Sequence, residues 1–134
     1  TEAQVLKEKL DWKNIRAIHI NDSVGPGNII TAEMKYENIT EMICEFGTKG
    51  VRAQKVASKV AKEVNKYLNN DAPVGEYLAD QLLLPMALAG QGSFICQTVS
   101  SHTKTNIEVI QKFIDVIITI TKENQEMNLI KIGP

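Results

Sequence analysis

The sequence predicts an α+β fold in which helices pack on one face of mixed sheets. Three patterns support this class: period-two alternation over residues 29–36 and 41–46, a helical repeat over 53–68, and β-branched alternation over 116–132. The 134 residues are 43% apolar and 23% charged, which is an ordinary globular composition. This composition excludes a disordered tail or a collagen-like chain.

The N-terminal part of the chain predicts a helix followed by strands. Apolar residues on one helical face predict a short opening helix that ends before Trp12. Alternation over residues 15–20 then predicts a strand in which His19 is half-exposed. Residues 29–36 and 41–46 also alternate and are joined by a short connection, which predicts a β-hairpin.

The clearest amphipathic helix is predicted from Ala53 to Leu68, where apolar residues recur every three or four positions. Five basic side chains fall almost opposite that apolar face: Arg52, Lys55, Lys59, Lys62 and Lys66. A stripe of this kind can bind phosphate groups. Because no aromatic residues are interleaved with it, a solvated face is the favoured interpretation.

A polar cluster closed by proline, residues 69–73, is the most linker-like stretch of the chain. We therefore expect a boundary there, between a first unit of residues 1–71 and a second of residues 72–134. Residues 77–89 are apolar on nearly every face and predict a buried helix that is kinked or broken at Pro85.

The second unit is expected to continue with a short interior strand over residues 93–97 and a polar loop over 99–102. Thr105 and Glu108 have the spacing of a capping box, which predicts a helix from that point to about residue 114. Phe113 is expected on its buried side. A closing hairpin over residues 116–132 completes the unit.

Charge and cysteine content limit the function classes. Lysine and arginine number 15 and aspartate and glutamate 16, so the net charge of −1 argues against a general polyanion binder. Cys44 and Cys96 lack the spacing of a zinc site, and no metal-ligating residue is predicted. No apolar run is long enough for a membrane helix, and no secretory leader is visible, so we expect free thiols in the cytoplasm.

Asp80 and Gln81 are candidate site residues because they interrupt the most apolar predicted helix. A carboxylate in such a place must be paired or hydrogen-bonded, since an unpaired one would cost several kcal/mol. The alternative, of equal weight, is a structural role in which Asp80 caps a loop or pairs with an arginine.

His102 is a second candidate because it lies where the predicted loop enters a capped helix. Backbone amides and the helix dipole favour bound phosphate at such a place, and a histidine there can attack or protonate a phosphoryl group. The alternative is an ordinary polar loop histidine.

Two long blocks, GEYLADQLLLPMALAGQGSF at residues 75–94 and HTKTNIEVIQKF at 102–113, closely resemble the RNA 3'-terminal phosphate cyclase family. GPGN at 25–28 and FGTKGV at 46–51 follow the order and spacing of the same family. The resemblance covers almost the whole chain but only the C-terminal part of the family's longer sequence. Gln91 is a departure, standing where the family usually has a small residue.

The resemblance also implies an assignment of the two units. Residues 1–71 are expected to be the second half of a small α/β domain that the family inserts into a larger one. Residues 72–134 are expected to be the end of the last of its repeated βαβαββ units.

For function, the resemblance implies an ATP-dependent conversion of an RNA 3'-phosphate to a 2',3'-cyclic phosphate, assisted by a divalent metal such as Mg or Mn. His102 matches the histidine that becomes covalently adenylated. To attack, His102 must be neutral and its other ring nitrogen needs a partner that fixes the tautomer, for which Asp80 is a candidate. Asp80 and Gln81 match polar residues of the nucleotide site. Tyr77 matches an aromatic residue that stacks on adenine, with Phe46 on the other side of the base. Core packing is the alternative for both rings, and more so for Phe46.

The expected partners are RNA with a 3'-phosphate end, ATP, the missing N-terminal part of the protein and, in a homo-oligomer, a second copy. Because that N-terminal part carries the family's metal-binding acid and basic phosphate contacts, we expect the isolated chain to be inactive. An alternative is a noncatalytic cyclase-like protein that binds RNA or assists ribosome assembly. A third interpretation is a structural module with exposed apolar surface.

Overall fold

The computed structural model describes residues 1–134, which form two compact units, residues 1–69 and 70–134. The boundary falls two residues before the division expected at 71/72. Both units combine helices with a small sheet, so the α+β class is confirmed. The assignment of each unit to a particular domain of the family stays a prediction.

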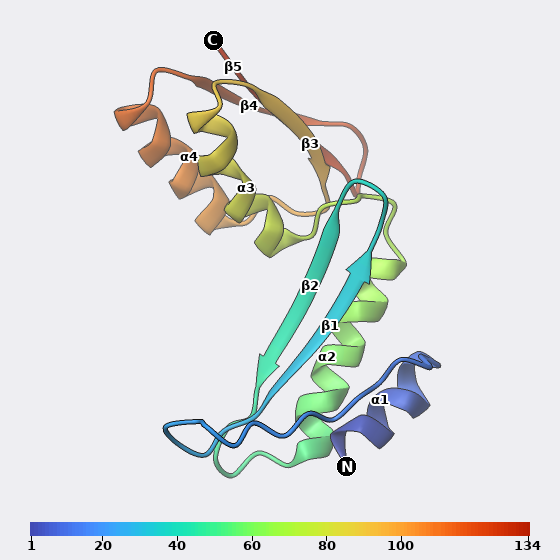
Figure 1. Ribbon diagram of the computed structural model, residues 1–134. Coiled ribbons are helices and arrows are strands. Elements are labelled where there is room, and N and C mark those ends of the chain that lie inside the picture. Colours follow the sequence, from blue (N-terminus) through green and yellow to red (C-terminus); the bar gives the residue numbers. More distant parts are fainter. The chain divides into compact units, whose positions relative to one another are not determined.

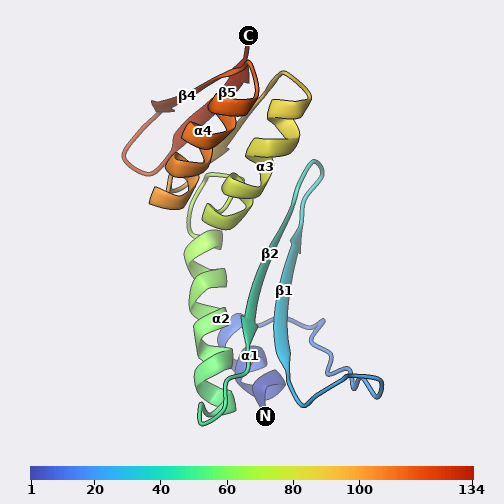
Figure 2. The same ribbon diagram turned by 90° about the vertical axis from the view of Figure 1, so that its left-hand side faces the viewer.

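The first unit is a hairpin with two helices. Its elements are α1 (Glu2–Leu10), β1 (Ile29–Lys35), β2 (Thr40–Phe46) and α2 (Ala53–Leu68). β1 and β2 pair antiparallel, in a register that runs from Ile29 opposite Phe46 to Lys35 opposite Thr40. α2 lies along one face of the hairpin (Figures 1 and 2).

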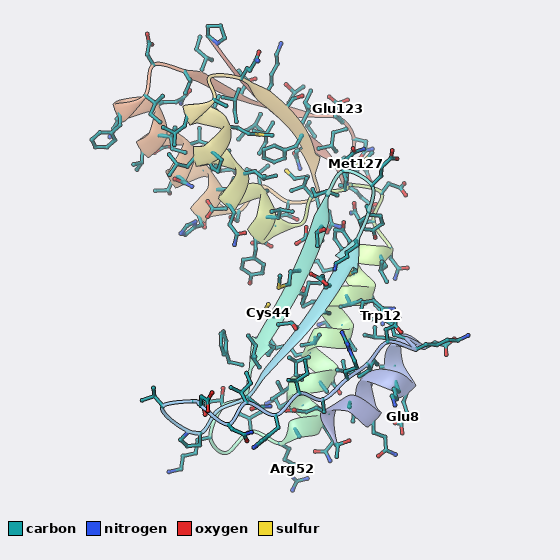
Figure 3. The ribbon with its side chains drawn as sticks, in the orientation of Figure 1. Glu8, Trp12, Cys44, Arg52, Glu123 and Met127 are labelled. Atoms are coloured by element: carbon teal, nitrogen blue, oxygen red, sulfur yellow. The ribbon has the colours of Figure 1, made fainter.

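The core of this unit lies between the hairpin and α2. Ile30, Ala32 and Met34 alternate inward along β1 and meet the apolar side of α2, which carries Val60 and Val64. Trp12 and α1 pack on the same core, and Trp12 is only partly buried (Figure 3). The predicted hairpin and amphipathic helix are therefore confirmed.

Carboxylates also occupy the inner side of β2. Glu41 is buried, and Glu45 Oε2 lies 2.7 Å from Lys59 Nζ of α2, so Lys59 is held in an ion pair and is not a free member of the basic stripe. Burial, with help from Tyr36 and Glu41, raises the pKa of Tyr67 to about 12. Tyr67 therefore stays neutral in the core.

The strand predicted over residues 15–20 is absent. These residues are irregular and mostly exposed, with Ile18 and Ile20 among the most exposed apolar side chains of the chain. Alternation of apolar and polar residues does not by itself form a strand, because a strand also requires a neighbouring strand to pair with. β1 and β2 pair only with each other.

The second unit is a three-stranded antiparallel sheet with two helices. Its elements are α3 (Glu76–Leu88), β3 (Gly92–Cys96), α4 (Ser101–Phe113), β4 (Ile117–Lys122) and β5 (Asn128–Gly133). The strand order is β3-β5-β4, and both helices lie on the same face of the sheet (Figure 1). The predicted closing hairpin is confirmed by the β4–β5 pairing. Its turn is fixed where Glu123 and Asn124 donate to the Met127 carbonyl (Figure 3).

α3 is buried on one side only, which corrects the expectation of a helix buried all round. Ala79, Leu83 and Ala87 are buried, whereas Leu88 is 72% exposed and Leu84 is also exposed. The helix continues through Pro85 without a break and ends before Gly90, whose φ of +76° suits a helix C-terminus.

The buried side of α4 also differs from expectation. Ile107 and Ile110 are buried as predicted, but Phe113 points to solvent. Phe113 is the last residue of the helix, and Ile114 already has an extended backbone. At about 100° per residue, Phe113 lies roughly a quarter turn from the stripe of Thr103, Ile107 and Ile110, so its ring does not face the sheet.

Leu83 and Leu88 provide a matched pair for testing the core of the second unit. Leu83 is fully buried, so Leu83→Ala is expected to lower the free energy of unfolding by about 2–5 kcal/mol. Leu88→Ala, on the exposed side of the same helix, is expected to change it by less than about 0.5 kcal/mol. Urea titration of each variant measures both values, and equal losses would contradict this packing.

The two cysteines are expected to differ in reactivity. Cys96 is fully buried, and burial raises the pKa of its thiol to about 11, whereas Cys44 lies on the exposed face of β2 (Figure 3). Because the thiolate is the reactive form, iodoacetamide at pH 8 is expected to label Cys44 alone in the folded chain and both thiols in urea. Mass spectrometry counts the labels, and rapid labelling of Cys96 in the folded state would contradict its burial.

Candidate active site

The position of α3 is set by the residues that precede it. Val74 donates its N–H to the Ile95 carbonyl and accepts from the Gln97 N–H, so it forms a single parallel bridge to β3. Gly75 follows as the N-cap of α3. This anchoring fixes the first turns of α3, which carry Tyr77 and Asp80, beside the strand.

α4 begins earlier than the sequence predicts, and this moves His102 from a loop into a helix. Ser100 is the N-cap, and its Oγ accepts a hydrogen bond from the Thr103 N–H at 3.0 Å. The Thr103 hydroxyl, fully buried, lies 2.9 Å from the same Ser100 Oγ. The capping box expected at Thr105 is therefore wrong, because the Ser100 cap lets Thr103, Ile107 and Ile110 form one buried stripe.

His102 and Asp80 are in direct contact. His102 Nδ1 lies 3.1 Å from Asp80 Oδ2, and the other carboxylate oxygen, Oδ1, accepts a hydrogen bond of 3.0 Å from Asn106 Nδ2. The Asp80 side chain is 23% exposed, so it is largely removed from water and satisfied by two donors. The prediction that this carboxylate has partners is confirmed; they are a histidine and an asparagine, not an arginine.

This contact defines which imidazole nitrogen is available for chemistry. An ionised carboxylate has no proton to donate, so the nitrogen facing it, Nδ1, is the one that carries the proton in a neutral imidazole. Nε2 then keeps its lone pair. The His102 side chain is 80% exposed, which leaves Nε2 accessible from solvent.

The N-terminal end of α4 also favours the binding of phosphate. His102 is the second residue of the helix, in the first turn, where backbone N–H groups have no carbonyl partner within the helix. The aligned peptide dipoles place partial positive charge at the same end. An anionic phosphate next to His102 would therefore meet amide donors and a favourable dipole.

The other predicted site residues lie on exposed surface. Tyr77, one turn before Asp80, is 78% exposed, and Gln81 is exposed on the same helix. Phe46 is 67% exposed at the end of β2 in the first unit, so core packing, the alternative considered for both rings and more so for Phe46, is wrong for both. Both aromatic rings are free of the core and available for stacking.

No group of three or more His, Cys, Asp or Glu side chains comes together in the structure in a way that could hold a metal ion. The Asp80 carboxylate contacts His102 and Asn106. No helix is long and apolar enough to cross a membrane.

Sequence reasoning missed two residues of this site, Asn106 and Ser100. Asn106 lies four residues after His102, a spacing that places both on one helical face, but only if the helix already includes residue 102. Ser100, three residues before Thr103, is a possible N-cap in the sequence. Thr105 and Glu108 match the capping box more fully, so the sequence predicts the later start.

Comparison with known proteins identifies the family. A sequence model of the family described as RNA 3'-terminal phosphate cyclase matches residues 3–120. The chain belongs to the RNA 3'-terminal phosphate cyclase family. This outcome confirms the resemblance carried by the two blocks around Asp80 and His102.

Individual cyclases show the extent of the match. The chain is 48% identical over 104 residues to an RNA 3'-terminal phosphate cyclase of Ralstonia nicotianae, covering 78% of this chain and 30% of that protein. It is 38% identical over 122 residues to one of Ectopseudomonas mendocina, covering 90% and 36%. It is 44% identical over 115 residues to one of Salmonella agona, covering 86% and 33%. The chain thus spans about a third of the length of the curated cyclases it matches.

The cap of this cyclase-family helix can be tested apart from any activity. Ser100→Ala removes the acceptor for the Thr103 N–H and is expected to lower the free energy of unfolding by about 1 kcal/mol. Ser101→Ala, at the next position and exposed, is expected to have little effect. Urea titration compares the two variants, and equal stability would contradict the assignment of Ser100 as the N-cap.

Proposed function

We propose that this chain is the C-terminal portion of an ATP-dependent RNA 3'-phosphate cyclase in which His102 is the nucleophile. The proposal rests on one observation above all: an exposed imidazole is held through Nδ1 by Asp80 at the N-terminal end of a helix. Relatives named RNA 3'-terminal phosphate cyclase support the reaction class. ATP and an RNA 3'-phosphate are the proposed substrates.

The proposed chemistry is covalent catalysis in three displacements. His102 Nε2 forms a bond to the α-phosphorus of ATP, and the bond from that phosphorus to the bridging oxygen breaks, so diphosphate leaves with the electron pair. An oxygen of the RNA 3'-phosphate then attacks the histidine-bound AMP, and the imidazole leaves. Finally, the neighbouring 2'-hydroxyl attacks the terminal phosphorus, loses its proton and displaces AMP.

Asp80 has a defined role in the first displacement. When Nε2 bonds to phosphorus, the imidazole becomes positively charged while Nδ1 keeps its proton. The carboxylate 3.1 Å from Nδ1 stabilises that charge and holds the ring so that Nε2 faces outward. The same stabilisation of positive charge does not help the later step, in which the neutral imidazole leaves. The contribution of Asp80 therefore lies in forming the histidine–AMP intermediate.

The remaining residues of α3 serve nucleotide binding in this proposal. Tyr77 offers an exposed aromatic face for adenine, and the exposed ring of Phe46 is proposed as a second stacking surface. Gln81 supplies an exposed amide for polar contacts. The amides of the first turn of α4 supply donors to a phosphate.

The divalent metal, Mg or Mn, is proposed to be held by residues outside this chain, because no metal-binding group is formed here. The basic phosphate contacts are assigned to the same missing part. We therefore propose that the isolated chain is inactive and that it requires the N-terminal part of the protein.

A noncatalytic cyclase-like protein that binds RNA or assists ribosome assembly is the alternative. A binding protein has no chemical use for an exposed histidine whose Nδ1 is held by a half-buried carboxylate. The pairing of His102 with Asp80 therefore favours catalysis over binding alone.

The nucleophile can be tested by labelling with ATP radiolabelled at the α-phosphate. The chain is combined with the N-terminal part of a full-length cyclase and a divalent metal, and an acid-labile protein-AMP adduct is expected. His102→Ala is expected to reduce adduct formation by roughly 10³-fold or more, because the attacking nitrogen is lost. His19→Ala, at the only other histidine and also exposed, is expected to label normally.

Two outcomes would count against the proposal. Labelling retained in His102→Ala would show that another residue is adenylated. No labelling of the wild-type mixture, with both parts folded, would favour the binding protein. Labelling of the chain alone would contradict only the proposed inactivity of the isolated chain.

A further inference from the structure

We infer that Asn106 is a positioning residue for His102, acting through Asp80. Its side-chain amide holds one carboxylate oxygen so that the other is kept on the imidazole Nδ1. The structural part of this inference concerns which nitrogen of His102 carries the proton. Its consequence for catalysis rests on the proposed function of His102 as a nucleophile.

The two carboxylate oxygens of Asp80 contact different residues of α4. Asn106 Nδ2 donates to Asp80 Oδ1 at 3.0 Å, whereas His102 Nδ1 contacts Oδ2 at 3.1 Å. Asn106 Nδ2 also lies 3.5 Å from the backbone carbonyl oxygen of Asp80. The amide is therefore placed against both the side chain and the main chain of Asp80.

Helical spacing explains why one carboxylate can be held by both residues. His102 and Asn106 are four residues apart on α4, so they lie on the same face, one turn from each other. Asp80 projects from α3, which packs beside α4 (Figure 2). The carboxylate thus lies opposite that face and reaches both side chains.

A second donor matters because the carboxylate group of an aspartate can rotate. The terminal torsion of an aspartate is broad and roughly two-fold, so a carboxylate with a single partner can turn and exchange its oxygens. A hydrogen bond to Oδ1 removes that freedom and keeps Oδ2 directed at His102. An imidazole facing a fixed acceptor retains its proton on Nδ1.

Asparagine suits this role because of its chemistry. The ionised carboxylate only accepts hydrogen bonds, so the amide must present its NH₂ group to Asp80. Unlike lysine or arginine, the amide adds no positive charge near an imidazole that becomes positive when it is adenylated. Asn106 therefore orients Asp80 without weakening the stabilisation that Asp80 gives to His102.

The test measures the proton directly. Long-range ¹H–¹⁵N spectra of the ¹⁵N-labelled chain distinguish Nδ1–H from Nε2–H imidazole, and with only two histidines, His102 and His19, the signals are few. Spectra are recorded at alkaline pH, where histidine is neutral. In the wild-type chain we expect His102 to be mainly Nδ1–H and His19 to serve as the internal reference.

Two variants remove the amide donor: Asn106→Ala and the isosteric Asn106→Asp. Each is expected to lower the ratio of Nδ1–H to Nε2–H at His102 by about fivefold, the size of one hydrogen bond's net contribution. Asp80→Ala gives the lowest ratio of Nδ1–H to Nε2–H expected, because the carboxylate itself is absent. Asn106→Gln, which keeps the amide on a longer side chain, is expected to recover part of the ratio. Asn65→Ala, an exposed asparagine within α2, is the matched control and should leave His102 unchanged.

The outcomes separate this inference from the proposed function. An unchanged His102 ratio in folded Asn106→Ala and Asn106→Asp overturns the inference and leaves the proposed nucleophile intact. Loss of the folded spectrum in both variants assigns Asn106 a purely structural role and also overturns it. A shifted ratio supports the inference. If the shift occurs while AMP labelling of the mixture with the N-terminal part stays normal, the positioning stands and its consequence for catalysis is overturned, whereas the nucleophile itself is tested by His102→Ala.

Discussion

The carboxylate of Asp80 is the constraint on which the second unit depends. It is largely removed from water on an otherwise apolar helix, and such a charge must be met by donors. Both donors come from α4, so the register of α4 against α3 is fixed to the position at which His102 and Asn106 face Asp80. The Ser100 cap works with this constraint, because it starts α4 early enough to include residue 102. A helix that began at the later capping box would leave His102 in a flexible segment with no fixed relation to Asp80.

The sheet supplies the rigidity behind this arrangement. Ile130 and Ile132 of the central strand are almost fully buried beneath the helices, and Leu83 of α3 is buried with them. The opposite side of α3 is apolar as well, with Leu84 and Leu88 exposed, whereas the exposed side of α4 is mostly polar apart from Val109 and Phe113. All-round hydrophobicity in a helix indicates partners on more than one side. Here α3 packs against the sheet and against α4, and its remaining side stays exposed.

The sequence predicts those features that local periodicity determines. The β1–β2 hairpin, α2 and the closing hairpin follow from alternation or from a single apolar stripe, and all three are present. The need for partners at Asp80 follows from the cost of burying a charge. One partner is predicted, because the resemblance makes Asp80 a candidate partner for the second ring nitrogen of His102, and the two side chains are 3.1 Å apart. Asn106 is not predicted, because it is distant in sequence from Asp80 and becomes its neighbour only through helix packing. Alternation over residues 15–20 predicts which faces a strand would have but not whether another strand pairs with it. Phe113 is exposed because it lies to the side of the stripe formed by Thr103, Ile107 and Ile110.

Exposure and order at His102 impose opposite demands, and the structure meets both. The proposed reaction requires a nitrogen that substrate can reach, and at 80% exposure the imidazole is open to solvent. An exposed side chain is ordinarily free to turn, and a turned ring would present Nδ1 in place of Nε2. The carboxylate prevents this by holding Nδ1, and it is itself largely removed from water and held at its other oxygen. The orientation of the exposed ring is therefore set from its Nδ1 side. In the proposed enzyme, the chain carries the prepared nucleophile, and the rest of the protein closes the site and holds the metal.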